Sequence, residues 1–438
     1  MSTSANAVVL AQARARDAAD PLRGLRERFA LPVDEHGAPL VYLCGHSLGL
    51  QPLAARELVT EELDEWARRA VEGHEHARRP WIPYHENLRS GLAALTGARP
   101  AEVVAMNSLT VNLHLMFASF YRPAGKRRRI VIEAGAFSSD RHAVASQLAW
   151  HGLDPQDNLI ELAPAAGADL IEERAIEALL AEHGREIALV WWPGVQFRTG
   201  QAFDIARIAS AAHAHGCLAG FDLAHSVGNT PLALHDSAAD FAVWCSYKYL
   251  NGGPGAIGGC FVHDRHASAL PKTAHRGTLP GARLAGWWGH EEDTRFLMEA
   301  EFHAADGADS WQVSNPPILA AAPLLASLAL FTAAGMEPLR EKSVALTGFL
   351  EELLRPLEPA VQIITPREPA ARGCQLSIRV AAGAAEGRRV FEQLRAAGVV
   401  CDWRTPDIIR VAPVPLYNRF EDVAHFAERL ARVLRGGA

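Results

Sequence analysis

The stretch that decides the fold is CLAGFDLAH at 217–225 together with FAVWCSYKYLNGGPG at 241–255. Each part opens with a short apolar run that predicts a buried strand. Asp222 ends the first run, and Lys248 comes just after the second. In open α/β sheets, ligands bind outside the carboxyl ends of the strands. We therefore expect Asp222 and Lys248 to face one binding site.

This pair suits pyridoxal phosphate, which needs a lysine for a Schiff base and an acid that keeps its pyridine nitrogen protonated. Lysine and arginine total 43, but the only lysines are Lys126, Lys248, Lys272 and Lys342. Because arginine cannot form an imine, a lysine kept between two tyrosines indicates a chemical role. The alternative is a lysine that merely caps a strand end. The nearby Asp222 and the following glycine turn favour the site.

Outside this stretch, apolar runs alternate with helical segments from about residue 101 to 262. This alternation predicts an α/β fold with a largely parallel sheet and helices on both faces. After about residue 315, a helical stretch at 318–357 with a break at Gly335 precedes the order strand, strand, helix, strand, strand, helix. We expect an N-terminal arm (1–40) that contributes to the small domain, a large cofactor-binding domain (41–315) and a small α+β domain (316–438).

The net charge, the cysteine pattern and the hydropathy of the sequence argue against several classes of protein. The formal net charge is −7 and no long basic run occurs, which argues against a nucleic-acid partner. The six cysteines are scattered without a CxxC pair, so we expect buried thiols and predict no disulfide and no metal site. No signal pattern and no apolar run of 18 residues is present, so we expect a cytoplasmic protein without a membrane partner.

Four further features are candidates for the site, and each has an ordinary structural alternative. Ser108-Leu-Thr110 stands where a strand passes into a helix, which suits the binding of a phosphate. The structural alternative is that Ser108 simply caps the helix. Phe137 follows a strand end and suits ring stacking, or is a core aromatic. His225 suits the cofactor pocket, or is a core histidine. Arg410 lies in an apolar strand and suits a substrate carboxylate, or a structural ion pair.

Blocks of sequence along nearly the whole chain resemble the kynureninase family, fold-type I pyridoxal-phosphate enzymes of the class V aminotransferase superfamily. The blocks, which are specific as an ordered set, are Gly45-His-Ser-Leu-Gly-Leu50, Ser108-Leu-Thr-Val-Asn-Leu-His114, Phe137-Ser-Ser-Asp140, Gly220-Phe-Asp-Leu-Ala-His225, Trp244-Cys-Ser-Tyr-Lys-Tyr-Leu-Asn251, Gly286-Trp-Trp-Gly-His290, Ser314-Asn-Pro-Pro-Ile-Leu319 and Ile409-Arg-Val-Ala-Pro-Val-Pro-Leu-Tyr-Asn418.

The resemblance implies a large domain with a mainly parallel seven-stranded sheet, a smaller α+β domain and pyridoxal 5'-phosphate as cofactor. It implies hydrolysis of L-kynurenine or L-3-hydroxykynurenine to anthranilate or 3-hydroxyanthranilate plus L-alanine. This reaction belongs to the kynurenine pathway of tryptophan catabolism and NAD biosynthesis. The resemblance also implies a homodimer with a shared active site.

The resemblance assigns catalysis to Lys248, which forms the Schiff base, to Asp222 at the pyridine nitrogen and to Tyr247. The residues implied to bind the cofactor are these three together with Leu109, Thr110, Phe137, Ser138, Ser139, Asp140, His225, Trp287 and Asn315. Of these, Trp287 and Asn315 come from the partner subunit in the family. The residues implied to bind substrate are Arg410, His74, Ser47 and Asn315, with Arg410 on the α-carboxylate.

Three features depart from the family pattern. His46 replaces the usual asparagine of the glycine loop, and Pro193 stands where a hydroxyl residue usually meets the cofactor. The segment Lys272 to Ala285 is long, so we expect a mobile surface loop there. His74 and Asn315 match the branch that favours the 3-hydroxylated substrate, whereas the alternative for His74 is a plain loop histidine.

Two other functions remain open from the sequence. One is another fold-type I enzyme, such as a cysteine desulfurase or a class V aminotransferase. A desulfurase needs a reactive cysteine on a mobile loop, whereas most cysteines here lie in apolar strands. The other is an inactive regulatory or scaffold protein. The intact set of lysine, acid and arginine argues against it.

Overall fold

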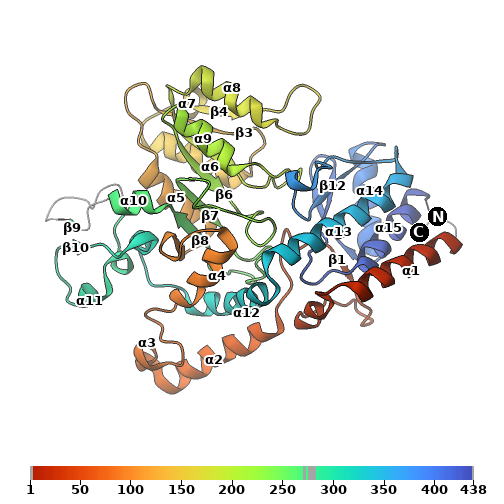
Figure 1. Ribbon diagram of the computed structural model, residues 1–438, viewed down its shortest axis with the longest axis horizontal. Helices are drawn as coiled ribbons and strands as arrows, with labels where there is room; N and C mark the ends of the chain where they lie inside the picture. The colour runs from red at the N-terminus through yellow and green to blue at the C-terminus, as the bar shows by residue number, and fades with distance from the viewer. Residues whose placement is uncertain (1–2, 270–272, 275–282, 437–438) are drawn as a thin grey trace.

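The computed structural model describes residues 3–269, 273–274 and 283–436. A large unit built on a seven-stranded sheet lies beside a smaller unit built on a four-stranded sheet (Figure 1). The N-terminal helix α1 (Thr3–Ala19) lies against the smaller unit, far from the seven-stranded sheet (Figure 1). The α/β class and the mainly parallel seven-stranded sheet expected from the sequence are confirmed.

The large sheet has the order β2-β8-β7-β6-β5-β3-β4. Its strands β3 to β7 are parallel to one another, whereas β8 runs antiparallel to both of its neighbours. No helix interrupts the connection from β7 to β8, and a parallel pair needs a longer crossover. The strands are β2 (Val103–Ala105), β3 (Arg129–Glu133), β4 (Leu159–Leu162), β5 (Ile187–Pro193), β6 (Leu218–Asp222), β7 (Phe241–Trp244) and β8 (Gly259–Val262).

Helices cover both faces of this sheet, because alternate side chains of each buried strand point to opposite sides. In β5, Val190 and Trp192 join one core cluster, while Leu189 and Trp191 join the other. The first face is covered by α4 (Glu86–Thr96), α8 (Glu173–His183), α9 (Ile205–Ala214) and α12 (Ile318–Ala334), and the second by α5 (Leu109–Phe120) and α6 (Ser138–Trp150).

Two glycines let aromatic rings pack flat against the strands beside β7. A Cβ at Gly220 would lie 2.2 Å from the ring of Phe241, and a Cβ at Gly259 would lie 2.2 Å from the indole of Trp244. Neither position tolerates a side chain without moving a fully buried ring. These contacts fix β7, the strand that leads to Lys248.

The smaller unit is an antiparallel sheet of order β11-β12-β15-β14 with its own hydrophobic core. Helix α1 packs on α15, and β1 pairs with β13, so the arm and residues 41–43 share this core. The elements are β11 (Val361–Ile363), β12 (Leu376–Val380), β14 (Asp402–Arg404), β15 (Ile408–Val411), β1 (Val41–Tyr42), β13 (Val399–Val400), α13 (Met336–Leu354), α14 (Ala384–Ala396) and α15 (Phe420–Leu434).

The expected long helix breaks at Gly335, whose φ is +76°, into α12 and α13. Helix α12 packs mainly on α2 and α4 of the large unit, and α13 runs across to the small one (Figure 1). Shorter or peripheral elements are α2 (Leu53–Arg69), α3 (Gly73–His76), α7 (Pro155–Asn158), α10 (Asp264–Ala269), α11 (Glu292–Arg295), β9 (Thr273–Ala274) and β10 (Phe302–His303).

Most of the predicted loop at Lys272 to Ala285 lies outside the described residues. Within the described residues, no single helix is long and apolar enough to cross a membrane. Helices α12 and α13 meet that criterion only as a pair, and they are bent by 85° at Gly335.

Candidate active site

A pocket opens where strands of the large sheet end and α5 and α6 begin. Glu133, Pro193 and Asp222 are the last residues of β3, β5 and β6. The lining residues are Leu109, Thr110, Glu133, Phe137, Ser139, Asp140, Pro193, Val195, Phe197, Asp222, Ala224, His225, Tyr247 and Lys248. The structure therefore brings together Asp222, Lys248 and seven further residues that the sequence singled out.

The amine of Lys248 lies at the centre of this group. Its Nζ is 3.0 Å from Nε2 of His225, 5.8 Å from the ring centroid of Phe137 and 5.9 Å from that of Tyr247. Burial, reinforced by the charge of Lys248, lowers the pKa of His225 well below its ordinary value. His225 is therefore a neutral imidazole, which accepts a hydrogen bond from the lysine amine.

The backbone around Lys248 is fixed from two sides. The carbonyl of Tyr247 accepts the N–H of Gly49 at 2.8 Å, and the carbonyl of Lys248 accepts the N–H of Asn251 at 3.0 Å. Asn251 has a φ of +50°, which turns the chain away after the lysine. The glycine loop and the turn together hold the lysine at the pocket.

Three carboxyl groups lie at the inner end of the pocket. Asp222 accepts the N–H of Ala224 at 2.8 Å, and Asp140 accepts the indole N–H of Trp191 at 3.0 Å. Burial raises the pKa of Asp222, with the charge of Lys248 opposing the rise. Burial and the charge of Asp222 raise the pKa of Asp140 well above its ordinary value.

Glu133 completes this carboxyl cluster. Burial raises its pKa to about 8, and the charge of Asp222 adds to the rise. Because the charge of Asp222 raises the pKa of both other acids, the three are not all ionised at neutral pH. Asp222, which faces the positive charge of Lys248, is the group that stays anionic, while Glu133 and Asp140 hold their protons.

The outer end of the pocket offers hydrogen-bond donors. Helix α5 begins at Leu109, and the side chain of Ser108 makes no capping hydrogen bond. The hydroxyls of Thr110 and Ser139 are 2.7 Å apart across the starts of α5 and α6. Free N–H groups at a helix start suit a phosphate. With a buried anion at the other end and Phe137 beside the amine, these residues fit pyridoxal phosphate.

Six of the expected residues do not line this pocket within the described chain. Arg410 is buried and forms an ion pair with Asp402, and its Nη1 donates to the carbonyl of Phe197 at 2.6 Å. Burial lowers the pKa of Arg410 to about 10. His46, which is fully buried, lies 3.6 Å from Asp402. The pairing of Arg410 with Asp402 is the structural alternative that the sequence left open.

The other five expected residues lie nearer the surface. Ser138 is exposed at the start of α6, and Ser47 is half-buried in the glycine loop. Trp287 is half exposed and donates its indole N–H to the carbonyl of Arg295 at 3.1 Å. Asn315 is exposed, and His74 is exposed with its ring edge-on to Trp81 at 5.4 Å.

Sequence reasoning missed four lining residues and noted Pro193 only as a departure. Glu133 follows the same strand-end rule that identified Asp222, and its apolar run, Ile130-Val-Ile132, was visible. Val195, Phe197 and Ala224 carry no polar signal and become lining residues only through the fold.

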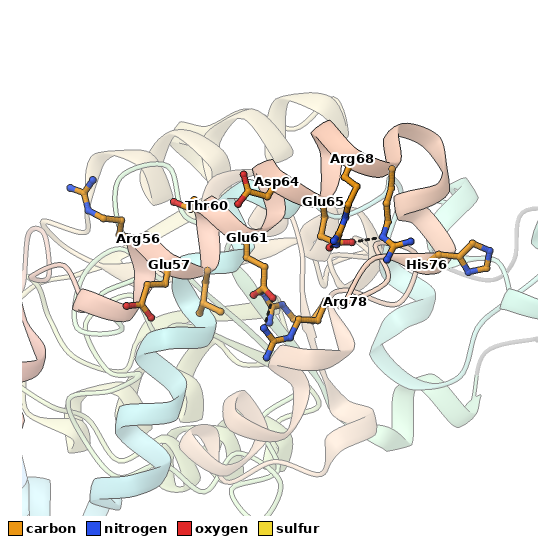
Figure 2. A pocket seen from close by; sticks show the side chains of 12 residues that line it. Arg56, Glu57, Thr60, Glu61, Asp64, Glu65, Arg68, His76 and Arg78 are labelled. Atoms are coloured by element: carbon orange, nitrogen blue, oxygen red, sulfur yellow. Dashed lines mark hydrogen bonds and ion pairs between the residues drawn. The ribbon is translucent and has the colours of Figure 1, made fainter.

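A larger hollow of about 1000 Å³ lies along α2 (Figure 2), and Lys248 is not among the residues that line it. Its wall is rich in charges, and several of these pair with one another. Glu61 pairs with Arg78 at 2.6 Å, and Glu65 pairs with Arg69 at 2.6 Å. Size alone therefore does not identify the site, and the smaller pocket with Lys248 is the candidate.

Comparisons with known proteins agree with this geometry. A family model described as the kynureninase C-terminal domain matches residues 339–430. The kynureninase of Xanthomonas euvesicatoria pv. vesicatoria is 59% identical over 422 residues, which cover 96% of this chain and 97% of that protein. The chain belongs to the kynureninase family. The kynureninase of Xanthomonas campestris pv. campestris strain B100 is 58% identical over 420 residues, or 95% of this chain and 96% of that protein.

Solved structures share the fold at low identity. The cystine C–S lyase C-DES, in complex with cysteine persulfide, has a TM-score of 0.73 at 20% identity and covers 90% of this chain and 97% of its own. The cysteine desulfurase CsdA of Escherichia coli has a TM-score of 0.74 at 17% identity and covers 95% of this chain and 99% of its own. These likenesses confirm the fold-type I architecture of a large and a small domain.

Membership of the kynureninase family makes the chain an enzyme with kynureninase function, a hydrolase of carbon–carbon bonds in ketonic substances. Its cofactor is pyridoxal phosphate. The desulfurase alternative is less supported, because all six cysteines are free thiols buried in the fold. Burial also raises the pKa of Cys374 to about 12, which disfavours a reactive thiolate there.

Proposed function

We propose that the chain hydrolyses L-kynurenine and L-3-hydroxykynurenine at the Lys248 pocket, releasing L-alanine with anthranilate or 3-hydroxyanthranilate. The observation that carries this proposal is the set in which the amine of Lys248 lies 3.0 Å from neutral His225, in one pocket with anionic Asp222. Measuring both products with each substrate tests it. Release of L-alanine without an aromatic amine would contradict it.

The roles within the pocket follow from charge and position. Pyridoxal phosphate, when bound, draws electrons from the substrate carbon that is attached to its amine. Asp222 is the buried anion suited to hold the proton on the pyridine nitrogen, and Phe137 is placed for ring stacking. The starts of α5 and α6, with Thr110 and Ser139, are suited to the phosphate.

Two side chains are suited to move protons. Lys248 is the amine that takes a proton from the α-carbon of the substrate, and its neighbour His225 holds it in place. Burial raises the pKa of Tyr247 above its ordinary value, so its phenol keeps its proton and can donate it at the γ-carbonyl. Tyr247→Phe should therefore lower kcat much more than cofactor binding, and equal losses of both would contradict this role.

Arg410 is proposed to bind the α-carboxylate of the substrate. It is buried, already forms one ion pair with Asp402, and leaves its Nε without a partner among the described residues. A carboxylate that replaces Asp402 on this guanidinium would keep the charge balance of a buried cation. Arg410→Leu should raise KM for substrate while the bound cofactor is retained.

The enzyme is proposed to be a homodimer that shares its active sites, and Ser138 and Ser47 are proposed to complete the cofactor and substrate contacts. Trp287 and Asn315 are exposed in the single chain, which supports contacts with a partner subunit. Light scattering during size-exclusion chromatography tests the assembly, and a fully active monomer would contradict it. Cytoplasmic location and a role in NAD biosynthesis remain predictions from the sequence.

The preferred substrate is proposed to be L-3-hydroxykynurenine. His74 and Asn315 are both exposed, so their polar groups are free to meet a phenolic hydroxyl in a shared site. Where the dimer buries these groups, a substrate without that hydroxyl leaves them unpaired and away from water, at a cost of about 1–3 kcal/mol. The test compares kcat/KM for both substrates in the wild type and in His74→Phe with Asn315→Thr. An unchanged ratio in the double variant would rule the idea out.

A further inference from the structure

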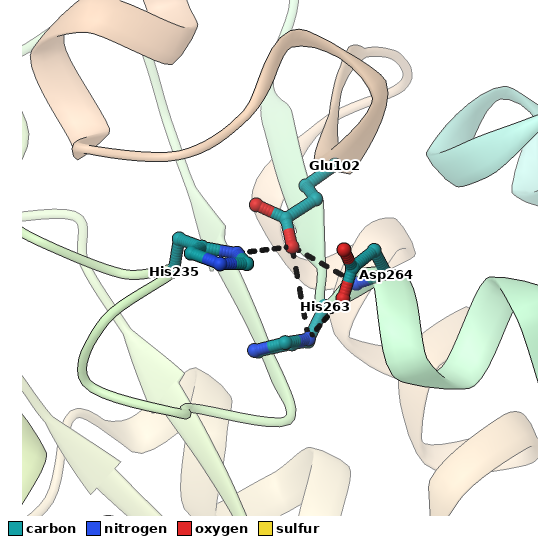
Figure 3. Close-up of side chains that lie close together, drawn as sticks. All are labelled: Glu102, His235, His263 and Asp264. Carbon is teal, nitrogen blue, oxygen red and sulfur yellow. Dashed lines mark hydrogen bonds and ion pairs between the residues drawn. The ribbon is translucent and has the colours of Figure 1, made fainter.

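Four polar side chains that the reaction does not use converge beside the large sheet (Figure 3). They lie at the start of β7, whereas Lys248 follows its end. They are Glu102, His235, His263 and Asp264, and they come from three separate segments. Glu102 lies just before β2, His235 lies in the loop before β7, and the last two directly follow β8. Because β8 is antiparallel to both neighbours, its end meets the starts of β2 and β7.

The potential ligand atoms of these residues all lie within 4.8 Å of one another. Oε1 of Glu102 is 2.8 Å from Nδ1 of His235 and 3.6 Å from Nδ1 of His263. Nδ1 of His263 is also 2.9 Å from Oδ1 of Asp264. Glu102 is fully buried and His263 is 9% exposed, whereas the side chains of His235 and Asp264 are 22% and 37% exposed, so the cluster is half-buried.

This arrangement calls for a positive charge at its centre. The backbone N–H of Arg265 donates to Nδ1 of His263 at 3.3 Å, so that nitrogen carries no proton and cannot donate to the two carboxylate oxygens beside it. The rings of His235 and His263 stack with centroids 4.9 Å apart and planes at 29°, so two imidazolium ions would repel each other. A single divalent cation would bind both nitrogens and balance the charge of Glu102, while the guanidinium of Arg99 pairs with Asp264.

The surrounding groups already hold the carboxylates in place. Oε1 and Oε2 of Glu102 accept the backbone N–H groups of Asp264 and Arg99, each at 2.9 Å. The guanidinium of Arg99 pairs with Oδ2 of Asp264 and leaves Oδ1 facing the histidines. The guanidinium of Arg265 pairs with Asp240 at 2.6 Å instead. Such outer contacts orient ligands in known metal sites.

We propose that Glu102, His235, His263 and Asp264 form a binding site for a divalent transition-metal ion, with Zn²⁺ the best match. Two imidazole nitrogens and two carboxylate oxygens are a donor set that zinc accepts in tetrahedral geometry. The ion would clamp the starts of β2 and β7 to the end of β8. The ligands come from three segments that lie far apart in sequence, which explains why the sequence predicted no metal site.

A second group, His85, Glu86 and Asp309, meets the same proximity criterion but suits a metal less well. It contains one histidine where the first group contains two, and its Asp309 pairs with the guanidinium of Arg89, as Asp264 pairs with that of Arg99. His85→Ala is therefore a matched control for unspecific binding. His213→Ala is another, since His213 bonds the carboxylate of Asp240 at 2.8 Å, outside the cluster.

The test measures zinc in the holoenzyme after chelator treatment, dialysis against Zn²⁺ and desalting. We expect the wild type, His85→Ala and His213→Ala to keep one zinc ion per chain by elemental analysis, and zinc to raise their Tm. His235→Ala and His263→Ala should each lose more than the roughly 10- to 100-fold in affinity that outer contacts contribute.

The proposal is overturned if the desalted wild type holds no zinc, or if His85→Ala loses zinc as fully as His235→Ala does. It is also overturned if both cluster variants keep the wild-type zinc content. Circular dichroism and gel filtration check folding before each measurement. If His263→Ala fails to fold, the test rests on the wild type and on His235→Ala. The native His235 side chain is 22% exposed, so its replacement disturbs the core less.

Discussion

Gly49→Ala should strongly lower kcat without unfolding the protein, because Gly49 packs directly on the backbone of Lys248. A Cβ at this position would lie 2.3 Å from the carbonyl oxygen of Lys248, 2.3 Å from Oδ1 of Asn251 and 2.8 Å from the Cα of Asn251. Two of these three atoms belong to backbone and cannot rotate away. The added methyl group must therefore push the lysine segment.

The size of the push follows from the same distances. An ordinary contact for a Cβ begins at 3.4 Å, so the carbonyl of Lys248 must retreat by about 1 Å. A misplacement of about 1 Å can cost about 100-fold in rate, which corresponds to about 2.7 kcal/mol in the barrier. We expect kcat to fall by about this factor, while the cofactor content stays near that of the wild type.

The assay follows formation of anthranilate and 3-hydroxyanthranilate and records the visible band of the bound cofactor. Gly348→Ala is the matched control: Gly348 lies in α13, and a Cβ there would meet nothing within 4 Å. It should keep full activity and gain slightly in Tm, since alanine favours helices. A Gly49→Ala enzyme with kcat within about threefold of the wild type would refute the reasoning.

Three further outcomes are expected. Lys248→Ala and Asp222→Ala should each abolish turnover in a folded chain, and wild-type activity in either would overturn the assignment. The pKa of Glu133 is raised to about 8 from 4.5, so the folded chain keeps a proton that the unfolded chain releases, and stability falls as pH rises between these values. Glu133→Gln should weaken that slope in Tm measured at pH 5 and pH 8.5, and parallel slopes would contradict it. The native enzyme should react slowly with a thiol reagent, because every cysteine is buried, and one fast-reacting thiol would contradict this.

Much of the fold could be predicted because its signals are local. Apolar runs in alternation with helical segments gave the parallel strands, and Gly335 gave the break between α12 and α13. Which elements pack against each other could not be predicted, because those contacts join segments that are distant in sequence. Helix α12 follows the large domain in sequence but packs on α2, which begins at residue 53. No short sequence pattern predicts a contact between segments so far apart.

The pocket shows the same division between local and distant information. Asp222 and Lys248 were predictable because each follows an apolar run, and strand ends gather at one edge of a parallel sheet. The pairing of Arg410 with Asp402 was not, since it depends on the register of β14 and β15, which sets the two residues opposite each other. A sequence shows that a buried arginine needs an anion, but not which anion lies nearest.

The strand-end rule also explains why the candidate metal site was missed. His263 and Asp264 follow the end of β8 just as Lys248 follows the end of β7, so both stand where polar groups are expected. The rule assumes that the strands are parallel, and β8 runs the other way. Its polar residues therefore meet Glu102 and His235 at the far edge of the sheet, and strand direction separates this cluster from the chemistry of the lysine.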